Sequence, residues 1–369
     1  MTVSVSKKDH NARRGRHKPS VAKDLLGWYD TNRRDLPWRA KPGVKNDPYR
    51  VWLSEIMLQQ TTVPSVGAYY RAFLLRWPSV ADLARATQDE VLGAWAGLGY
   101  YSRARNLHRA AQVVAAAHGG VFPSTAAELR TLPGVGPYTA AAVAAIAFDE
   151  VVAALDTNGE RILSRLFAIE APLPQSRKRI AEVAADLVPT DRPGDFAQAL
   201  MDLGSAICTP KRPGCLVCPL SLHCRARVLG IAENLPVKKP KPDRPLKRGA
   251  AYVAFDEQGA VHLVRRPEKG LLGGMLQPSM GEWRVAFPTS KGMKEEAPFQ
   301  GPWRKCPGIV SHGFTHFLLE LEVYAATFTR RPNSEGLWLP PERLDGAALP
   351  TVMKKVIRHA EGANPPKKR

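Results

Sequence analysis

The hydrophobic period of this chain changes once, at a basic stretch of residues 233–248 that contains four prolines. Before it, across residues 21–231, apolar residues recur at helical spacing between Pro and Gly stops, which predicts a mostly helical domain. After it, residues 251–255 and 261–263 alternate around a Gln-Gly turn, which predicts a β-hairpin, and an alternating run at 317–323 predicts a further strand. The stretch itself is expected to be an extended linker because it is rich in Pro, Lys and Arg.

A length of 369 residues with 44% apolar residues leaves room for two hydrophobic cores. An apolar helical stripe at residues 352–357 adds a helix to the strands after the linker, so this part is expected to be α+β. We therefore expect a multidomain protein with an all-α domain before the linker. The predicted bounds are a disordered basic arm at 1–19, the helical domain at 20–232, the linker at 233–248, the α+β domain at 249–360 and a basic tail at 361–369.

The chain is strongly positive, with 53 Lys and Arg residues against 34 Asp and Glu residues and a formal net charge of +19. A surplus of this size attracts a polyanion, because binding releases condensed counterions, so nucleic acid is the expected partner. The basic ends supply part of the count, and solubility is their alternative role. No apolar run approaches the roughly 18 residues of a membrane span, and the first residues are polar and basic. We therefore expect a cytoplasmic protein with no membrane partner.

Four of the five cysteines lie in one short segment, with the spacing Cys208-x6-Cys215-x2-Cys218-x5-Cys224. In a reducing compartment this grouping indicates a metal or cluster site rather than disulfides. Zinc sites usually pair two short knuckles, whereas this segment has one Cys-x2-Cys and uneven flanks. Four thiolates around one iron–sulfur cluster are therefore favoured, with zinc as the alternative. Basic residues between the first two cysteines predict that the loop faces DNA.

The segment from Leu132 to Ala140 predicts a tight turn followed by an Ala-rich helix. Gly134 and Gly136 permit a turn that directs backbone N–H groups outward at a helix N-terminus, where they and the helix dipole favour a phosphate. This pattern indicates the hairpin of a helix-hairpin-helix motif, in which Leu132, Gly134, Val135 and Gly136 contact DNA. An ordinary glycine-containing helix connection is the alternative.

Asp156 is the first of two candidate catalytic carboxylates. It ends the apolar run from Val151 to Leu155, where a carboxylate held at the end of a buried segment can face a cationic sugar. The alternative is helix capping, since Asp is a good cap residue and Thr157 with Glu160 fits the capping box.

Glu55 is the second candidate. Apolar residues of one predicted helix surround it, and burial of this kind raises the pKa of a carboxyl toward the range that suits a proton donor near neutral pH. The alternative is a salt bridge from Glu55 to an arginine such as Arg34 or Arg39.

Together these motifs resemble those of adenine DNA glycosylases of the MutY type, within the endonuclease III superfamily. The match covers about residues 25–224, and the order of the motifs makes it specific. The segments that carry it are RRDLPWR (33–39), SEIMLQQT (54–61), GLGYYSR (97–103), LPGVGPYTA (132–140), LDTN (155–158) and the four cysteines.

The resemblance implies a helix-hairpin-helix glycosylase domain with a 4Fe-4S loop at residues 208–224. Glu55 would protonate adenine on its imidazole-side ring nitrogen and make the base a good leaving group. Asp156 would stabilise the oxocarbenium-like sugar, electrostatically or by transient covalent attachment. Asn158 and Tyr138 would shape the site.

The same resemblance implies contacts to the flipped base and to the duplex. Gln60 and Tyr100 would fill or wedge the base stack and offset part of the stacking lost on flipping. Arg39 and Gln198 would line the base pocket. The implied partner is double-stranded DNA with adenine opposite 8-oxoguanine or guanine, bound by a monomer.

One substitution within the motifs bears on strand cleavage. Glycosylases of this superfamily that also cut the strand form a Schiff base through a lysine that follows the hairpin, where this chain has Tyr138. No lysine occurs between Lys45 and Lys178. A monofunctional glycosylase that leaves an abasic site is therefore expected. A bifunctional pyrimidine glycosylase/lyase and a DNA-binding protein without activity are the alternatives.

The α+β domain resembles the NUDIX-like domain with which this family inspects 8-oxoguanine. The Glu-rich, metal-binding helix of a NUDIX hydrolase does not follow residues 270–275, so a reader without hydrolase activity is implied. The Phe-Ser-His reading loop of the family corresponds to Phe314, Thr315 and His316. Threonine in place of serine keeps the hydroxyl and adds a methyl group that bears on discrimination against guanine. Simple packing of this Phe and His at the start of a strand is the alternative.

Overall fold

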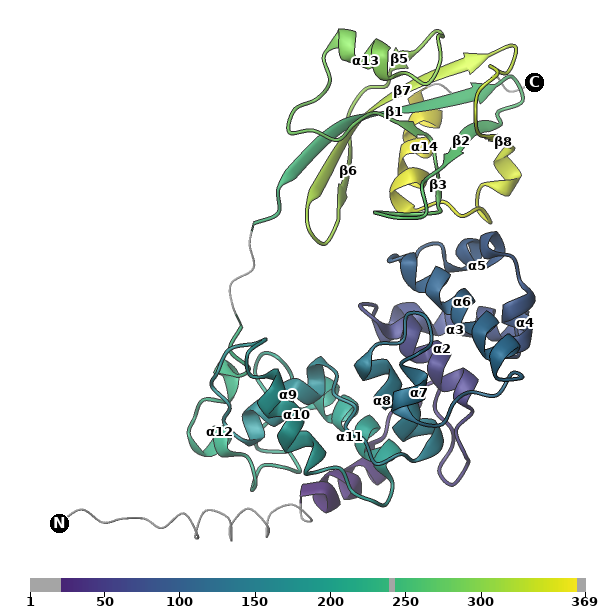
Figure 1. The fold of residues 1–369 in the computed structure, drawn as a ribbon. Coiled ribbons are helices and arrows are strands. Elements are labelled where there is room, and N and C mark those ends of the chain that lie inside the picture. Colours follow the sequence, from purple (N-terminus) through teal and green to yellow (C-terminus); the bar gives the residue numbers. More distant parts are fainter. Residues whose placement is uncertain (1–20, 239–242, 364–369) are drawn as a thin grey trace, which may run out of the picture. The chain divides into compact units, whose positions relative to one another are not determined.

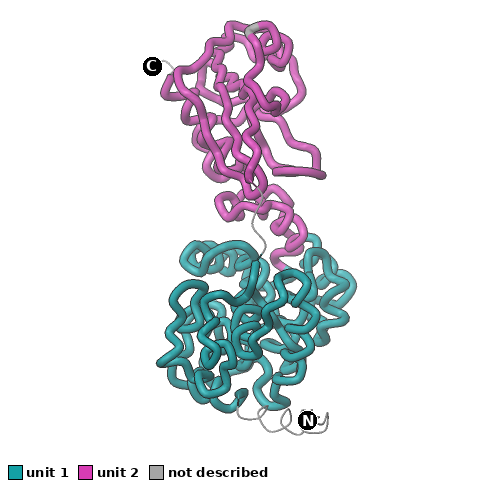
Figure 2. Tube along the Cα trace, turned by 90° about the vertical axis from the view of Figure 1, so that its left-hand side faces the viewer, with its two compact units in different colours: residues 1–81, 109–240 teal, residues 82–108, 241–369 magenta. Residues whose placement is uncertain are grey.

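The structure is a computed structural model that describes residues 21–238 and 243–363. By their contacts the residues divide into two compact units, one of residues 1–81 with 109–240 and one of residues 82–108 with 241–369 (Figure 2). The predicted basic arm lies outside the described residues. The predicted tail begins inside the last helix, which continues to Ala363.

The first unit is helical, as the spacing of its apolar residues predicts (Figure 1). Residues 21–32 form its first described helix. The helices that follow within this unit are α2 (Pro48–Leu58), α3 (Val63–Arg76), α7 (Ala126–Leu129), α8 (Pro137–Phe148), α9 (Thr157–Leu166), α10 (Arg177–Ala185), α11 (Pro193–Ala206), α12 (Arg225–Val228) and the 3-10 turn η1 (Ala232–Asn234).

Helix α8 is the centre of the first unit. Its residues from Thr139 to Ala147 are all buried, and it packs against both α2 and α11. Small side chains allow this close packing: a Cβ on Gly194 of α11 would lie 2.5 Å from the carbonyl oxygen of Ala145. Helix α11 also packs against α9. Four helices distant in sequence therefore meet around one region, where the candidate catalytic residues lie.

A segment of the predicted helical domain groups with the second unit. Helix α5 (Gln88–Trp95) lies wholly within residues 82–108, while α4 (Val80–Arg85) and α6 (Ser102–Ala117) cross the division. Asp89 forms a bidentate salt bridge with Arg265, and Arg105 donates to the carbonyl oxygen of Glu268. The sequence predicted a division only at the linker, because such contacts between remote residues leave no mark in local periodicity.

The rest of the second unit is an α+β domain built on a mixed sheet with the order β3-β2-β1-β7-β5. The central strands β1 and β7 run parallel, in register from Leu246 with Leu318 to Asp256 with Phe328. The elements are β1 (Leu246–Asp256), β2 (Val261–Arg265), β3 (Leu276–Gln277), β4 (Ser279–Met280), α13 (Ser290–Glu296), β5 (Arg304–Lys305), β6 (Val310–Gly313), β7 (Leu318–Phe328), β8 (Leu337–Leu339), η2 (Pro341–Arg343) and α14 (Thr351–Ala363).

The predicted hairpin, strand and helix of this domain are all present. Phe255 pairs with Val261 across the hairpin, and α14 buries its predicted stripe, from Val352 to Ile357, against one face of the sheet. Strand β1 begins at Leu246, inside the predicted linker, and residues 266–289 contain no helix. Within residues 21–238 and 243–363, no helix combines the length and apolar character that a membrane span requires.

Candidate active site

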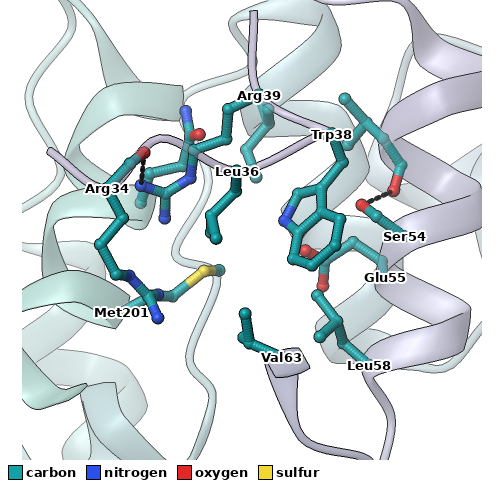
Figure 3. Close-up of a pocket in the computed structure, with 12 residues that line it drawn as sticks. Arg34, Leu36, Trp38, Arg39, Ser54, Glu55, Leu58, Val63 and Met201 are labelled. Carbon is teal, nitrogen blue, oxygen red and sulfur yellow. Dashed lines mark hydrogen bonds between the residues drawn. The ribbon is translucent and has the colours of Figure 1, made fainter. Parts of the chain in front are cut away.

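A cavity of ≈ 40 Å³ lies beside the carboxyl group of Glu55 (Figure 3). Its walls are mostly apolar with a few convergent polar groups, as is typical of ligand sites. The predicted pocket residues Arg39 and Gln198 both line it, so the structure brings them to Glu55. A volume of this size holds water rather than a purine, so side chains must move to admit a base. The lining residues are Arg34, Leu36, Trp38, Arg39, Val51, Ser54, Glu55, Leu58, Val63, Ile146, Gln198 and Met201.

Glu55 is held on the buried face of α2. Asp47 caps this helix by accepting from the backbone N–H of Tyr49 at 2.8 Å. The Glu55 side chain is only 6% exposed, and burial raises its pKa to about 7. A hydrogen bond from Tyr138 opposes this rise, and the charge of Asp156 adds to it. The burial and the raised pKa that the sequence predicted for Glu55 are thus present, and its role as a proton donor stays a prediction.

The alternative of a Glu55–arginine salt bridge is not observed among the described residues. Arg34 and Arg39 instead bind the carboxylate of Asp202 on α11. Glu55 is therefore left with a tyrosine hydroxyl as its polar partner. A neutral partner of this kind suits a group that gives up a proton.

Asp156 is the N-cap of α9, and its two carboxylate oxygens are both hydrogen-bonded. Oδ1 accepts from the backbone N–H of Gly159 at 2.8 Å, and Oδ2 accepts from Nδ2 of Asn158 at 2.7 Å. The capping box expected for Thr157 and Glu160 does not form, because the helix begins one residue earlier and Glu160 pairs with Arg177 at 2.8 Å. Capping and placement in the site are thus compatible roles of Asp156, since its cap geometry fixes the carboxylate near Glu55.

Two residues that the sequence did not indicate, Arg161 and Gly204, hold Asn158 in place. Arg161 donates to Oδ1 of Asn158 at 2.9 Å and to the backbone oxygens of Cys208 and Gly204, each at 2.7 Å. A Cβ on Gly204 would lie 2.4 Å from Cβ of Asn158, so only glycine permits this approach. Arg161 therefore connects the catalytic region with the cysteine segment. Local sequence patterns give no signal for such a bridge.

The predicted hairpin is present between α7 and α8. The N–H of Val135 donates to the carbonyl oxygen of Leu132 at 3.1 Å, and Gly134 has the left-handed φ of +75° that the turn requires. Gly136 is the N-cap of α8 with no side-chain partner for the first amides of the helix. Such a terminus is suited to an anion. Tyr138 on the first turn of α8 faces Glu55.

The two predicted wedge residues share an unusual backbone conformation. Gln60 has φ +55° and Tyr100 has φ +48°, in the left-handed region that side chains rarely adopt. Tyr100 is 43% exposed, and the guanidinium of Arg103 lies 5.6 Å from its ring centroid. Strained backbone that presents an exposed side chain is frequent at functional sites.

The four cysteines of the predicted cluster segment line one cavity of ≈ 30 Å³ together with Arg165. Burial, together with the charges of the three other cysteines, raises the pKa of the Cys218 thiol to about 11. Thiols this close together repel as thiolates unless a cation group lies between them. Among the described residues no three Cys, His, Asp or Glu side chains are placed to hold a single metal ion. Four sulfurs around a common space are a donor set that suits either an iron–sulfur cluster or zinc, so both expectations from the sequence remain open at this point.

The predicted reading loop connects β6 and β7. Phe314 packs on Phe317 with ring centroids 4.7 Å apart, and the N–H of Phe314 donates to the carbonyl oxygen of Phe317 at 2.9 Å. Thr315 and His316 are exposed at the tip of the resulting turn, and the hydroxyl groups of Tyr100 and Thr315 are hydrogen-bonded within the second unit. Packing therefore explains Phe314 but does not explain the two exposed polar residues.

Comparisons with known proteins agree with this geometry. Residues 53–189 match the HhH-GPD superfamily of base excision DNA repair proteins, and residues 250–359 match the NUDIX domain. The adenine DNA glycosylase of Mus musculus is 37% identical to this chain, over 94% of this chain and 79% of the mouse protein. This chain belongs to the adenine DNA glycosylase family. The adenine DNA glycosylase of Buchnera aphidicola is 31% identical, over 91% of this chain and 96% of its own length.

The adenine DNA glycosylase family assignment confirms the two-part fold and the class of enzyme that the sequence predicted. A solved thermostable thymine-DNA glycosylase superposes with a TM-score of 0.53 at 32% identity, covering 58% of this chain and 99% of that one. Glu55 and Asp156 both lie within the HhH-GPD match, whereas Asp202 and the four cysteines lie beyond its end. The chain is thus a DNA glycosylase of base excision repair.

Proposed function

We propose that this chain removes adenine from double-stranded DNA in which the adenine lies opposite 8-oxoguanine or guanine. It hydrolyses the N-glycosidic bond after base flipping and leaves an abasic site. The observation that carries this proposal is the grouping of Tyr138 and Asp156 around the buried carboxyl group of Glu55, which itself lines the cavity. The names of the curated relatives support adenine as the base.

The two carboxyl groups divide the chemistry between them. Buried Glu55 holds a proton near pH 7 and donates it to the purine, so that the base leaves as a neutral molecule. Asp156, fixed by hydrogen bonds at both oxygens, places its charge where the sugar becomes cationic. Water then completes the hydrolysis. With tyrosine at position 138 and no lysine from residue 46 to residue 177, no amine of this region is available for a Schiff base.

The remaining predicted residues bind the DNA and the cofactor. The hairpin from Leu132 to Gly136 binds a phosphate, Gln60 and Tyr100 enter the base stack, and the turn at Thr315 reads the opposite base. Cys208, Cys215, Cys218 and Cys224 hold a 4Fe-4S cluster. When bound, the cluster crosslinks this segment and stiffens it, and the chain's own arginines attach the segment to α9.

The test is incubation with end-labelled duplexes that carry adenine opposite 8-oxoguanine, guanine or thymine, resolved with and without alkali. Release of adenine opposite 8-oxoguanine, with strand breaks only after alkali, supports the proposal. Breaks without alkali contradict the monofunctional mechanism. Binding without base release favours a DNA-binding protein that lacks activity.

The rate of base release should fall as the pH rises above about 7, because Glu55 must be protonated. Its pKa is raised from the usual 4.5 to about 7. Below pH 4.5 Glu55 is protonated in both the native and the unfolded state, so its burial does not lower the free energy of unfolding through ionisation. Above about pH 7 it is ionised in both states, and the free energy of unfolding is lower by on the order of 3 kcal/mol. Glu55→Gln should abolish base release and raise the free energy of unfolding by about 3 kcal/mol at pH 8.

This expectation is checked by single-turnover rates across the pH range and by denaturant unfolding of both proteins. Near pH 4.5 the two unfolding free energies should converge, which is the internal control. A wild-type rate that is flat from neutral to alkaline pH would contradict the general-acid role of Glu55.

Thr315→Ala should weaken discrimination between 8-oxoguanine and guanine by about tenfold, the value of one hydrogen bond. Adenine release at saturation opposite guanine should change little, because Thr315 lies on the loop between β6 and β7 and not at the Glu55 cavity. Thr315→Ser, which keeps the hydroxyl, is the matched control. An equal loss of activity on all duplexes would show that Thr315 does not read the opposite base.

A further inference from the structure

Asp202 is a buried carboxylate that binds two arginines of the segment before α2. It is 1% exposed, on the face of α11 that meets this segment. The backbone N–H of Arg34 donates to its Oδ2 at 3.0 Å, and Nη2 of Arg39 donates to its Oδ1 at 2.8 Å. Nε of Arg34 also donates to Oδ1, and Nη1 of Arg39 also donates to Oδ2. Each carboxylate oxygen of Asp202 therefore accepts two hydrogen bonds.

Both arginines line the cavity that contains Glu55 (Figure 3). The Arg39 side chain is 5% exposed, so its charge is poorly screened by water, whereas that of Arg34 is one-third exposed. The Asp202 carboxylate is the group that compensates this buried charge. Burial by itself raises the pKa of Asp202, but the hydrogen bonds and charges of Arg39 and Arg34 outweigh it and lower that pKa.

We propose that Asp202 is a positioning residue of the active site, which holds Arg39 and Arg34 at the wall of the base cavity and compensates their charge beside Glu55. This inference rests on the proposed function, in which Glu55 is the proton donor. A purely structural role of Asp202 would affect stability and leave the behaviour of Glu55 unchanged.

The charged and titratable groups that act on Glu55 come from three parts of the chain. They are Tyr138 of α8, Asp156 at the start of α9 and Arg39, whose neighbour Arg34 lines the same cavity. Asp202 of α11 is connected to Glu55 through its ion pair with Arg39. Arg39 lowers the pKa of Glu55 and Asp156 raises it. Without the Asp202 charge, Arg39 would act on Glu55 uncompensated in a medium of low dielectric constant. The proton of Glu55 would then be lost at a lower pH.

The test compares single-turnover adenine release from a duplex with adenine opposite 8-oxoguanine for full-length wild type and Asp202→Asn. In the variant, the fall of the rate at alkaline pH should begin about one pH unit lower than in wild type. At pH 8 the rate should therefore be roughly tenfold lower than that of wild type, and the difference should disappear toward acid pH. The double variant Arg39→Gln, Asp202→Asn should return the alkaline limb toward its wild-type position, because the guanidinium charge of Arg39, which Asp202 compensates in wild type, is also removed. Asp195→Asn is the matched control, since Asp195 lies on the same helix and pairs with Arg192.

Two further variants keep the test decisive if Asp202→Asn does not fold. Asp202→Glu keeps the charge and should keep the wild-type limb, and Arg39→Gln alone should move the limb to higher pH. An unmoved limb in folded Asp202→Asn, or in Arg39→Gln, would overturn the inference. Wild-type protein that releases no adenine would instead overturn the proposed function on which it rests.

Discussion

Replacing Asp156 by asparagine should reduce the rate of base release by about 10³-fold or more, because a fixed charge at the developing cation is lost. The fold should tolerate the change, since asparagine caps helices about as well as aspartate. Its side-chain oxygen can still accept from the N–H of Gly159, as Oδ1 of Asp156 does. What disappears is the negative charge and the acceptor that Asn158 uses.

The measurement is single-turnover release of adenine opposite 8-oxoguanine, together with the dissociation constant of the duplex. Binding should be nearly normal, because the hairpin and the reading loop are untouched. Glu160→Gln is the control: Glu160 lies in the first turn of the same helix and pairs with the largely exposed Arg177. Substantial release by Asp156→Asn, or an equal loss in Glu160→Gln, would show that Asp156 serves mainly as a helix cap.

Asp156 also shows what local sequence reasoning can and cannot reach. Good cap residues occur at two adjacent positions, Asp156 and Thr157, so the pattern fixed the region of the helix start but not the residue. Tertiary contacts decide which of the two residues is the N-cap, because Glu160 pairs with Arg177 and does not form a capping box with Thr157. The apolar residues Ile162, Leu163 and Leu166 of this helix are buried. Phe167, the next apolar residue, follows the last helical turn and is exposed.

The residues that sequence reasoning missed act on partners far away in the chain. Asp202 binds Arg39 across 163 positions, and Arg161 reaches Cys208 across 47. An aspartate or arginine on an amphipathic helix is most often a solvated residue, so nothing local distinguishes these. Motifs with fixed local geometry, such as the glycine turn before α8 and the cysteine spacing, were predictable because their chemistry depends on neighbours in sequence.

Arg165→Leu should have the largest structural effect of any single change near the cysteine segment. Arg165 is 2% exposed, and its guanidinium donates to Sγ of Cys208 at 3.2 Å. It also donates to the backbone oxygens of Thr209, Pro210 and Leu235, at 2.8, 3.2 and 3.0 Å. Leucine would leave the buried carbonyl oxygen of Leu235 without a partner, which costs about 1–3 kcal/mol, and would also remove the part-buried hydrogen bonds to Cys208, Thr209 and Pro210. A loss of at least about 3 kcal/mol of unfolding free energy and of most of the bound iron is therefore expected.

The measurement is iron content and visible absorbance per chain after purification, with the unfolding midpoint, which do not depend on activity. Arg225→Leu is the matched control, because Arg225 is an exposed arginine directly after Cys224 and its loss removes the same charge without emptying a buried site. If both variants lose iron equally, the positive charge near the cysteines is what retains the iron, and the hydrogen bonds of Arg165 are not. If Arg165→Leu retains iron and stability, the four cysteines alone hold the segment, and the link from Cys208 to Asn158 must run through Arg161.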